Sequence, residues 1–587
     1  MEHIDGNDLY QMFNYGTNFV IQERKLLNDI NVFPVPDGDT GNNLVHTMQT
    51  ISRESKVSDS FYETLESISD SALIGARGNS GIIFAQFVNG LRIESVNKAK
   101  VSINEFTEMA LNSVKHVYSS LSSPVEGTML SVIKDWAHGL KTILSKVKSI
   151  QEYFKLAFKK AELSLEKTKE QLAVLKRNNV VDSGALGFVL FLKGINSYFS
   201  DEEIEQLDFE ELGIDYTHDF DEKITYRYCT EGLVEYKDVS EAEIKNALKN
   251  YGDSLIVVMG THMFRVHIHT DKPELVFKEL IAFGKIITQK VDDMIQDIAF
   301  KKSNKDTVIV TDSIADINKE FLLENNVATL SININIDDVT YYDKLTINNE
   351  ILFDMIETCD EYPTTSTPTI KEINDLFSKL LLNYKNIIVI LVADKLSATY
   401  KAVKTEADKL NEKGKKIYVI DSYNNSVSQG LLVKKAVEML NDGISVKEIV
   451  NQIEEMKTKA EILVCLETFK YATMSGRLPK VIGKIGMFFK IRPIMTLNEI
   501  GKGSAFGFAV SQKGITKKIV KHIKKDLEKN EIDSYALIHC LNPDLLTEYK
   551  QIFTDIIGKE PEYTSVVSSA TAIHSGKGSV AIGYIRK

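Results

Sequence analysis

Residues 35–43 read Val-Pro-Asp-Gly-Asp-Thr-Gly-Asn-Asn, and this stretch governs how the first third of the chain is interpreted. Proline fixes φ and glycine permits positive φ, so the run predicts a tight loop rather than a helix or a strand. Its two carboxylates, Asp37 and Asp39, are hard oxygen ligands that suit Mg²⁺ together with phosphate oxygens and water. A surface Asp-Gly turn is the plain alternative. The apolar residues on both sides of the loop weigh against that alternative.

The composition bounds the class of protein. At 587 residues the chain is too long for one core, so we expect roughly two to four domains. A formal net charge of −12 argues against a nucleic-acid partner. Four scattered cysteines without a CxxC pair favour a reducing compartment. Neither a secretory signal nor an apolar run of membrane-spanning length is visible, so we expect a soluble, cytoplasmic protein without a transmembrane segment.

The hydrophobic pattern changes along the chain and indicates a multidomain protein. Residues 1–200 carry apolar residues at helical spacing, with helices expected at 63–74, 82–91, 106–121 and 150–175. Residues 201–221 are acidic and are interpreted as a linker. Residues 222–300 predict a small α/β domain. Its expected strands lie at 223–229, 254–259 and 265–269, and its expected helices at 241–249 and 273–283.

The remainder, residues 306–587, repeats a strand, loop and helix pattern. The clearest examples begin at residues 307, 387 and 417. Such alternation predicts a mostly parallel sheet with flanking helices.

Three further glycine and hydroxyl loops accompany the aspartate loop, at residues 75–81, 124–130 and 181–187. The first is expected to precede a helix that begins at Ile82. Backbone N–H groups at a helix N-terminus bind anions, and glycine lets them approach a phosphate closely. The loops contain no Walker lysine, and together with the aspartates they favour phosphoryl transfer. A purely structural role as connections between helices is the alternative.

Four segments in the same order carry a family resemblance: NVFPVPDGDTGNN, GARGNSG, PVEGTML and VVDSGALG. Through them, residues 1–200 resemble the DhaL-type kinase domain shared by dihydroxyacetone kinases and bacterial fatty acid kinases. The first segment points to the fatty acid kinase branch. The resemblance implies an all-α antiparallel barrel that holds ATP and Mg²⁺ at one end.

The resemblance also implies roles for individual residues. Asp37 and Asp39 are the expected Mg²⁺ ligands and catalytic groups. Asn31, which stands where the dihydroxyacetone enzymes have a third aspartate, is the third candidate Mg²⁺ ligand. Arg77 is expected to stabilise the transferring phosphoryl group, with a structural ion pair as the alternative. Helix capping is the alternative for the hydroxyl groups. The expected nucleotide-binding residues are Thr40, Asn43, Asn79, Ser80, Gly81, Thr128, Asp182 and Gly184.

Cys229, His267 and His269 form a candidate zinc set in the small α/β domain. Strand alternation places both histidines on one face, and three N/S ligands leave a fourth position open. On the residues alone a coincidental gathering remains an alternative. The segment resembles the middle domain of fatty acid kinases, where YCTE and HxHT motifs recur, and that resemblance favours zinc. Glu231 is interpreted as a fourth ligand or a base.

Hydroxyl groups follow several strands of the last region, at 311–313, 397–399 and 421–422. Ligands of open parallel sheets bind beyond the carboxyl ends of strands, so these groups suit a carboxylate or a phosphate. Serial helix capping is the alternative.

The segments VTDSIAD, PTTSTP, LSATY, SGRLPK and IHSGKGSVAIGY make residues 306–587 similar to the DegV family of fatty-acid-binding proteins. The resemblance implies two α/β subdomains around one buried acyl chain. The residues that would hold the fatty acid carboxyl group are Thr365, Ser366, Ser397 and His574, supported by Arg477.

Together these resemblances predict a fatty acid kinase that moves the γ-phosphoryl group of ATP to a fatty acid carboxylate. The product would be an acyl phosphate for phospholipid synthesis. Two alternatives stay open: a lipid-binding or regulatory protein with an inactive kinase-like domain, and a dihydroxyacetone-type kinase. The expected ligands are a fatty acid, ATP, Mg²⁺ and Zn²⁺. A homodimer and acyltransferases that use acyl phosphate are the further partners considered.

Overall fold

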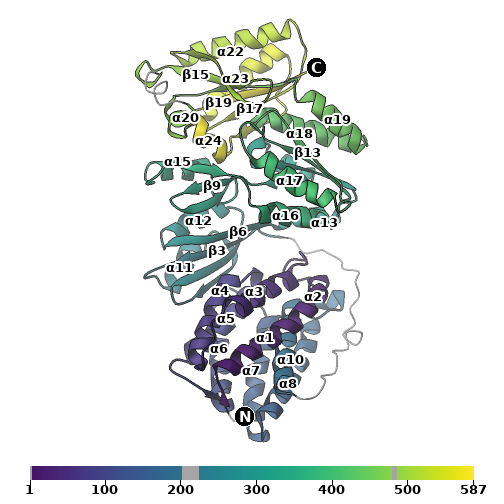
Figure 1. Cartoon of the computed structure of the whole chain (residues 1–587), viewed down its shortest axis with the longest axis vertical. Coiled ribbons are helices and arrows are strands. Elements are labelled where there is room, and N and C mark those ends of the chain that lie inside the picture. The colour runs from purple at the N-terminus through teal and green to yellow at the C-terminus, as the bar shows by residue number, and fades with distance from the viewer. Residues whose placement is uncertain (1–2, 201–223, 479–485) are drawn as a thin grey trace. The chain divides into compact units, whose positions relative to one another are not determined.

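The computed structural model describes residues 3–200, 224–478 and 486–587 (Figure 1). These residues form two units, Met1–Ile298 and Ala299–Lys587. The acidic linker expected at 201–221 lies outside the described residues, as does the end of the SGRLPK segment. Within the described residues, none of the helices combines the length and apolar character that a membrane span requires.

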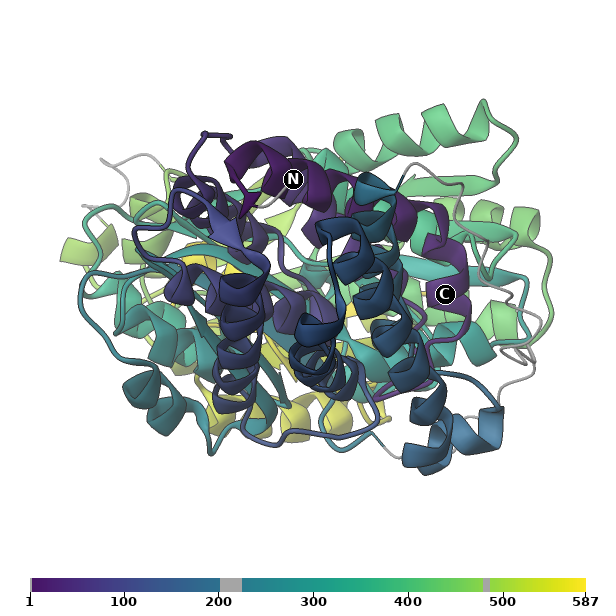
Figure 2. The same cartoon turned by 90° about the horizontal axis from the view of Figure 1, so that it is seen from below.

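The first region of the first unit is helical, as predicted. Its helices pack side by side in a closed ring: α1 touches α3 and α4, successive helices from α4 to α8 contact one another, and α10 joins α8 to α1 (Figures 1 and 2). The helices are α1 Gly6–Gln22, α2 Arg24–Asp29, α3 Thr40–Glu54, α4 Phe61–Gly75, α5 Gly78–Glu94, α6 Ile103–Ser120, α7 Met129–Ile143, α8 Ile150–Gln171, α9 Ala173–Asn178 and α10 Ser183–Phe199. A short antiparallel pair, β1 His3–Ile4 and β2 Val101–Ser102, lies beside them.

Helix α10 is a deeply buried member of this ring and is apolar on nearly every side. Its Phe191 meets Phe13 and Phe84 edge to face, and its Phe188 meets Trp136 in the same way. Such aromatic pairs stabilise a core beyond the area that they bury. A helix buried on all sides holds its N-terminal residues at a fixed place, which matters for the site below.

The second region of the first unit is a four-stranded antiparallel sheet in the order β4-β5-β3-β6. The strand expected at 223–229 begins only at Tyr228, so that prediction was wrong over most of its length. Leu233, Ile256 and Val258 of this sheet join the same core as the helices. The elements are β3 Tyr228–Glu235, α11 Glu241–Leu248, β4 Gly252–Met259, β5 Met263–Thr270, α12 Pro273–Ile281 and β6 Lys285–Asp293; α13 Met294–Lys302 crosses the division between the units.

The described residues of the second unit form three sheets. The parallel sheet β13-β12-β7-β8 confirms the prediction for the strands on which it was based. The six-stranded sheet β16-β15-β14-β19-β17-β18 is antiparallel except for its β17/β18 pair, so a mostly parallel sheet was wrong for this part. The short turn that joins β15 to β16 makes a hairpin, which cannot connect parallel neighbours. A small antiparallel sheet, β10-β9-β11, completes the set.

The strands of this unit are β7 Thr307–Asp312, β8 Ala328–Leu330, β9 Asn333–Ile336, β10 Val339–Tyr342, β11 Thr364–Ser366, β12 Asn386–Leu391, β13 Ile417–Asp421, β14 Ala460–Cys465, β15 Arg492–Leu497, β16 Gly503–Ala509, β17 Ile532–His539, β18 Thr564–Val566 and β19 Val580–Arg586. Its helices are α14 Lys319–Glu324, α15 Asn349–Ile356, α16 Ile370–Leu380, α17 Thr399–Asn411, α18 Ser426–Asn441, α19 Val446–Met456, α20 Lys470–Met474, α22 Gln512–Leu527, α23 Pro543–Ile557 and α24 Ser569–Ser575. The two larger sheets belong to separate apolar cores, as expected for two α/β subdomains.

Candidate functional site

The aspartate loop connects α2 to α3 and is braced from within by Asn31. The Asn31 amide nitrogen donates to the Val35 carbonyl oxygen at 2.7 Å, and its amide oxygen accepts hydrogen bonds from the backbone and hydroxyl groups of Thr40. Because both ends of the Asn31 amide are used inside the loop, this residue holds the loop in shape. Asp37 and Asp39 are half-buried on the same loop, and their carboxylates fit a hard divalent cation.

The glycine loop packs against the start of α3. Helix α5 begins at Gly78 rather than at Ile82 as predicted, so Asn79 and Ser80 lie in its first turn. Gly78 has a φ of 58°, and a Cβ there would come 2.4 Å from the Asn43 amide nitrogen. Glycine is therefore required at this position on both counts. A Cβ added at Gly81 would come 2.5 Å from the Thr47 hydroxyl oxygen of α3.

Arg77 is the N-cap residue of α5 and is half-buried. No ion pair joins it to any residue that the structure describes. Burial lowers the pKa of the Arg265 guanidinium, and the nearby charge of Arg77 lowers it further. An arginine beside another arginine, at a helix N-terminus, is a position suited to an anion.

A cavity of about 110 Å³ joins the helical region to the antiparallel sheet. Four of the predicted nucleotide residues line it: Asn79, Ser80, Thr128 and Asp182. The remaining wall is largely apolar and includes Phe33, Ile83, Leu121 and residues 254–256 of β4. A polar end and an apolar wall suit the phosphates and the base of a nucleotide.

Asp182 and Thr128 also have structural roles. The Asp182 carboxylate accepts hydrogen bonds from the backbone N–H groups of Met129 at 3.0 Å and Ala185 at 2.7 Å, which ties the start of α7 to the start of α10. Burial raises its pKa to about 6. The Thr128 hydroxyl caps α7 through Leu130, so the capping alternative describes it as well. At Gly184 a Cβ would come 2.7 Å from the Ser80 hydroxyl, which shows how closely α10 approaches α5.

The antiparallel sheet brings the candidate zinc residues together. Ligand atoms of Cys229, His267 and His269 all lie within 4.8 Å of one another, and the Cys229 sulfur is 3.8 Å from His267 Nδ1. Nε2 of His267 is buried without a hydrogen-bond partner among the described residues. Burial, reinforced by His267, lowers the pKa of His269 to about 3, so its imidazole is neutral as metal ligation requires. Two imidazoles and one thiol at these distances fit zinc.

The same face of the sheet is charged and faces the aspartate loop. Lys290 forms an ion pair with Asp292 at 2.6 Å and lies 4.0 Å from Glu231. Burial, together with the carboxylates of Glu231, Asp292 and Asp39, raises the pKa of the Cys229 thiol. Asp39 is thus close enough to this face to act on it electrostatically. Glu231 Oε1 lies 3.7 Å from His267 Nδ1, and its carboxylate has further partners that are described below.

The second unit holds an apolar cavity of about 700 Å³. All five residues predicted to hold a carboxyl group line it: Thr365, Ser366, Ser397, Arg477 and His574. The wall away from them is formed by aliphatic side chains of the strands, such as Ile462, Val464 and Met495. A cavity of this size and lining suits a ligand with a long apolar body.

His574 supplies a neutral imidazole to this cavity. Burial, with a contribution from the Arg477 charge, lowers the pKa of His574 to about 4. Its Nδ1 has no hydrogen-bond partner among the described residues. Ser397 shares a hydrogen bond with the Thr399 hydroxyl at 2.8 Å, and Ser366 accepts one from the Asn335 amide at 3.1 Å.

Sequence reasoning missed two cations of the cavity, Lys395 and Lys502. Lys395 stands two residues before Ser397, and Lys502 follows the turn between β15 and β16, so neither belongs to a motif. Two of the other strand-end hydroxyls have structural partners instead: Thr311 donates to the Ile390 carbonyl oxygen and Ser422 to that of Asn424. At those positions the hydroxyl groups have structural partners, although neither bond caps a helix.

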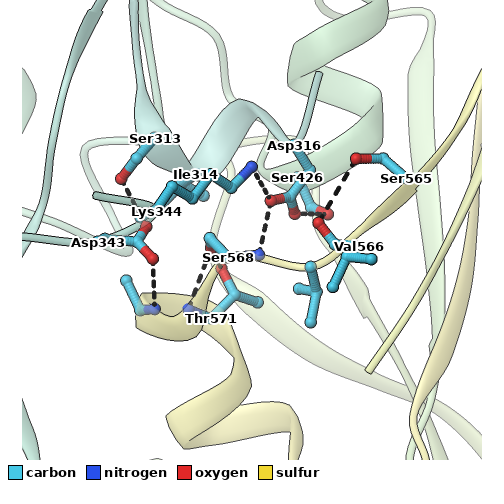
Figure 3. Close-up of polar contacts among 12 residues, drawn as sticks. Ser313, Ile314, Asp316, Asp343, Lys344, Ser426, Ser565, Val566, Ser568 and Thr571 are labelled. Carbon is cyan, nitrogen blue, oxygen red and sulfur yellow. Dashed lines mark hydrogen bonds and ion pairs between the residues drawn. The ribbon is translucent and has the colours of Figure 1, made fainter. Parts of the chain in front are cut away.

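Two buried carboxylates hold the helix that carries His574 (Figure 3). Asp316 accepts hydrogen bonds from the Ser568 backbone at 2.7 Å and from the Ser426 hydroxyl at 2.6 Å. Asp343 accepts them from the Ser569 backbone at 2.8 Å and from Ser313 at 2.6 Å. Because the carboxylates bind N–H groups at the N-terminus of α24, they fix its position against the wall of the cavity.

Comparison with known families agrees with this geometry. Residues 34–197 match the DAK2 domain, residues 225–299 match a middle domain of the fatty acid kinase type, and residues 306–587 match the DegV family, described as uncharacterised. The chain is a fusion of these three domain types. The predicted resemblances and the multidomain fold class are thereby confirmed.

Among curated relatives, an uncharacterized protein of Staphylococcus epidermidis is 33% identical over 343 residues, which cover 53% of this chain and 62% of the relative. An uncharacterized protein of Staphylococcus saprophyticus is 34% identical over 307 residues, covering 50% of this chain and 55% of the relative. The fusion thus spans between half and two thirds of the length of these relatives.

Solved structures resemble the DegV domain. A fatty acid binding DegV family protein from Streptococcus agalactiae is 24% identical, covers 48% of this chain and 99% of that chain, and gives a TM-score of 0.44. DegV from Bacillus subtilis, described as a fatty acid binding protein, is 22% identical, covers 48% of this chain and 100% of that chain, and gives a TM-score of 0.43.

Proposed function

We propose that the fusion is a fatty acid kinase: the DegV domain holds a fatty acid, and the DAK2 and middle domains transfer the γ-phosphoryl group of ATP to its carboxylate. One observation carries the proposal. A single cavity of about 700 Å³ has an apolar wall and all five carboxyl-binding candidates, in a chain whose other unit has the loops of a phosphoryl-transfer site. The acyl phosphate product would feed acyltransferases of phospholipid synthesis.

The reaction balances without a proton. A carboxylate oxygen forms a bond to the γ-phosphorus, the bond between that phosphorus and the bridging oxygen breaks, and ADP leaves with the electron pair. A fatty acid carboxylate is already ionised near neutral pH, so no general base is required. Positioning and charge neutralisation are the main tasks of the protein in such a transfer.

Each residue has a role in this scheme. Asp37 and Asp39 would hold Mg²⁺, which supplies charge neutralisation when bound, while Asn31 keeps their loop in shape. Arg77 is free of ion pairs among the described residues and would contact the transferring phosphoryl group. Ser80, with the N–H groups at the start of α5, would hold the phosphates. Thr128 and Asp182 would close the nucleotide pocket, and Thr40, Asn43, Gly81 and Gly184 shape the helix starts around it.

Cys229, His267 and His269 would bind Zn²⁺ beside this pocket. The zinc would hold the polar face of the middle domain in place opposite the aspartate loop. Metal analysis of the purified protein, compared with the Cys229→Ser variant, tests this assignment. One zinc per chain in the wild type and none in the variant is the expected result.

The carboxylate would bind in the DegV domain through His574, Ser397, Thr365 and Ser366, with Arg477 at the mouth of the cavity. Burial of the acyl chain contributes about 0.8 kcal/mol for each methylene, so the apolar wall supplies most of the affinity. The polar residues then orient the head group.

Two experiments test the proposal. Solvent extraction and mass spectrometry of the purified protein should find a bound fatty acid. An ATP-dependent hydroxamate assay with that fatty acid should then detect acyl phosphate. A bound fatty acid without acyl phosphate would instead support the second candidate, a lipid-binding regulatory protein. Phosphorylation of dihydroxyacetone in place of the fatty acid would support a dihydroxyacetone-type kinase.

A further inference from the structure

Arg265 of the middle domain reaches across to the helical region. Its guanidinium donates hydrogen bonds to the carbonyl oxygens of Leu73 and Ile74, both at 3.2 Å. These carbonyls belong to the last turn of α4, directly before the glycine loop. Terminal carbonyls of a helix lack partners within the helix, and a buried cation there is favourable.

Glu231 takes the other side of the same loop. One carboxylate oxygen accepts a hydrogen bond from the Gly78 backbone N–H at 2.7 Å, and the other accepts one from Arg265 at 3.2 Å. Gly78 is the first residue of α5. The two side chains are nearly inaccessible to solvent, with 1% of Glu231 and 5% of Arg265 exposed.

The ion pair thus connects the end of α4 to the start of α5. The residue that would normally cap α5 is Arg77, whose side chain makes no capping hydrogen bond. A carboxylate at a helix N-terminus is the usual solution to this problem, and here it comes from a separate domain. Asn79 and Ser80, which line the nucleotide cavity, follow Gly78 directly.

We propose that Glu231, held by Arg265, is a positioning residue for the nucleotide site: it caps α5 from the middle domain and fixes the glycine loop in its phosphate-binding conformation. The inference rests on the proposed function. It makes the middle domain a structural part of the nucleotide site, independent of any zinc that the domain binds. It also replaces the interpretation of Glu231 as a zinc ligand or base.

Three substitutions separate the length of the side chain from its charge. Glu231→Gln keeps an acceptor within reach of Gly78 but loses the charge. Glu231→Asp keeps the charge but is one methylene shorter, so it cannot span the same distance. Glu231→Ala loses both. The matched control is Glu235→Gln, an exposed position at the end of the same strand.

Isothermal titration of the full-length protein with Mg·ATP measures the effect directly. We expect Glu231→Ala to weaken binding roughly 10- to 100-fold, the range for loss of a hydrogen bond to a charged group. Glu231→Asp should resemble Glu231→Ala, while Glu231→Gln should recover most of the affinity. The control variant Glu235→Gln should match the wild type in zinc content, fatty acid affinity and melting temperature.

The outcomes distinguish this inference from the proposed function. If the wild-type protein binds no Mg·ATP, both the proposed function and the positioning role of Glu231 are contradicted. Wild-type binding with equal affinity in Glu231→Ala would overturn the positioning role alone. Loss of zinc in Glu231→Ala, to the extent seen in Cys229→Ser, would show that Glu231 is a ligand instead. Retention of affinity by Glu231→Asp but not by Glu231→Gln would show that charge, rather than reach to Gly78, is what matters.

Discussion

The nucleotide cavity and the acyl cavity differ in size and in the source of their polar groups. The first measures about 110 Å³ and joins polar groups at the starts of α5, α7 and α10, segments far apart in the sequence, to a largely apolar wall. The second measures about 700 Å³ and is mostly aliphatic, with a neutral imidazole and a few hydroxyl groups among its polar parts. One site must be completed by metal and phosphate charges. The other is an apolar space already present in the fold.

This difference predicts how strongly single substitutions affect each site. Electrostatic stabilisation depends on a few charges whose geometry cannot be replaced. Acyl binding is spread over many weak apolar contacts, each of which is individually small. Single substitutions should therefore affect catalysis far more than they affect acyl binding. We expect the largest effect at a metal ligand.

Replacement of Asp37 by alanine should lower acyl phosphate formation by about 1000-fold, because one ligand of the charge-neutralising metal is lost. The acyl content of the purified variant should equal that of the wild type. Hydroxamate formation and mass spectrometry of extracted lipid measure the two properties. Joint loss of both would show that the sites do not divide the work as proposed.

The His574→Ala substitution should weaken fatty acid binding by roughly 10- to 100-fold, since a hydrogen bond to a carboxylate is lost while the apolar wall remains. Fluorescent fatty acid displacement measures the change. Mg·ATP affinity should not move. The exposed His138 provides the control, and an equal effect of His138→Ala would contradict the assignment.

Substitution of Gly184 by alanine should weaken Mg·ATP binding by about 10-fold, because the new Cβ would lie 2.7 Å from the Ser80 hydroxyl. Gly507→Ala is the matched control, as nothing lies within 4 Å of the added Cβ there. If both variants bound Mg·ATP as the wild type does, the close approach of α10 to α5 would not matter for the nucleotide.

Asp343 should make the second unit more stable at mildly acidic pH. Burial raises its pKa from 3.8 to about 6. The folded state therefore binds the proton more tightly than the unfolded state, and this contribution is fully present below about 3.8 and lost as pH rises through about 6. Lowering the pH from about 7 to about 5 should increase the free energy of unfolding by about 1 kcal/mol through this group.

Urea unfolding of the wild type and of Asp343→Asn at both pH values isolates this contribution. The variant should show a smaller gain on acidification than the wild type. Substitution of the exposed Asp442 by asparagine should leave the gain unchanged. A variant with the full wild-type response would show that Asp343 does not titrate in this range.

Local motifs predicted the residues that act close to their own segment. Thr365, Ser397 and His574 occur in short motifs, and all of them line the predicted cavity. The two histidines of β5 also share a face, because alternation within one strand is a local property. The helical pattern of the first region followed from spacing within each segment.

Contacts between distant segments could not be predicted. The hydrogen bond from Gly78 to Glu231 joins residues 153 positions apart, and no pattern in either segment indicates the other. The bonds from Asp343 to the start of α24 are of the same kind. The antiparallel character of the six-stranded sheet was not predicted. Its strand β19 pairs with both β14 and β17, an arrangement that is set by tertiary packing.

The closed ring of the helical region has a consequence for the order of folding. Helices α1 and α10 contact each other although they span Gly6–Gln22 and Ser183–Phe199, so their pairing is among the most non-local of that region. During synthesis α1 emerges long before α10, so the part of its apolar face that packs on α10 has no partner until then. Contacts of such long range form late and slowly. The ring should therefore close only after α10 has left the ribosome.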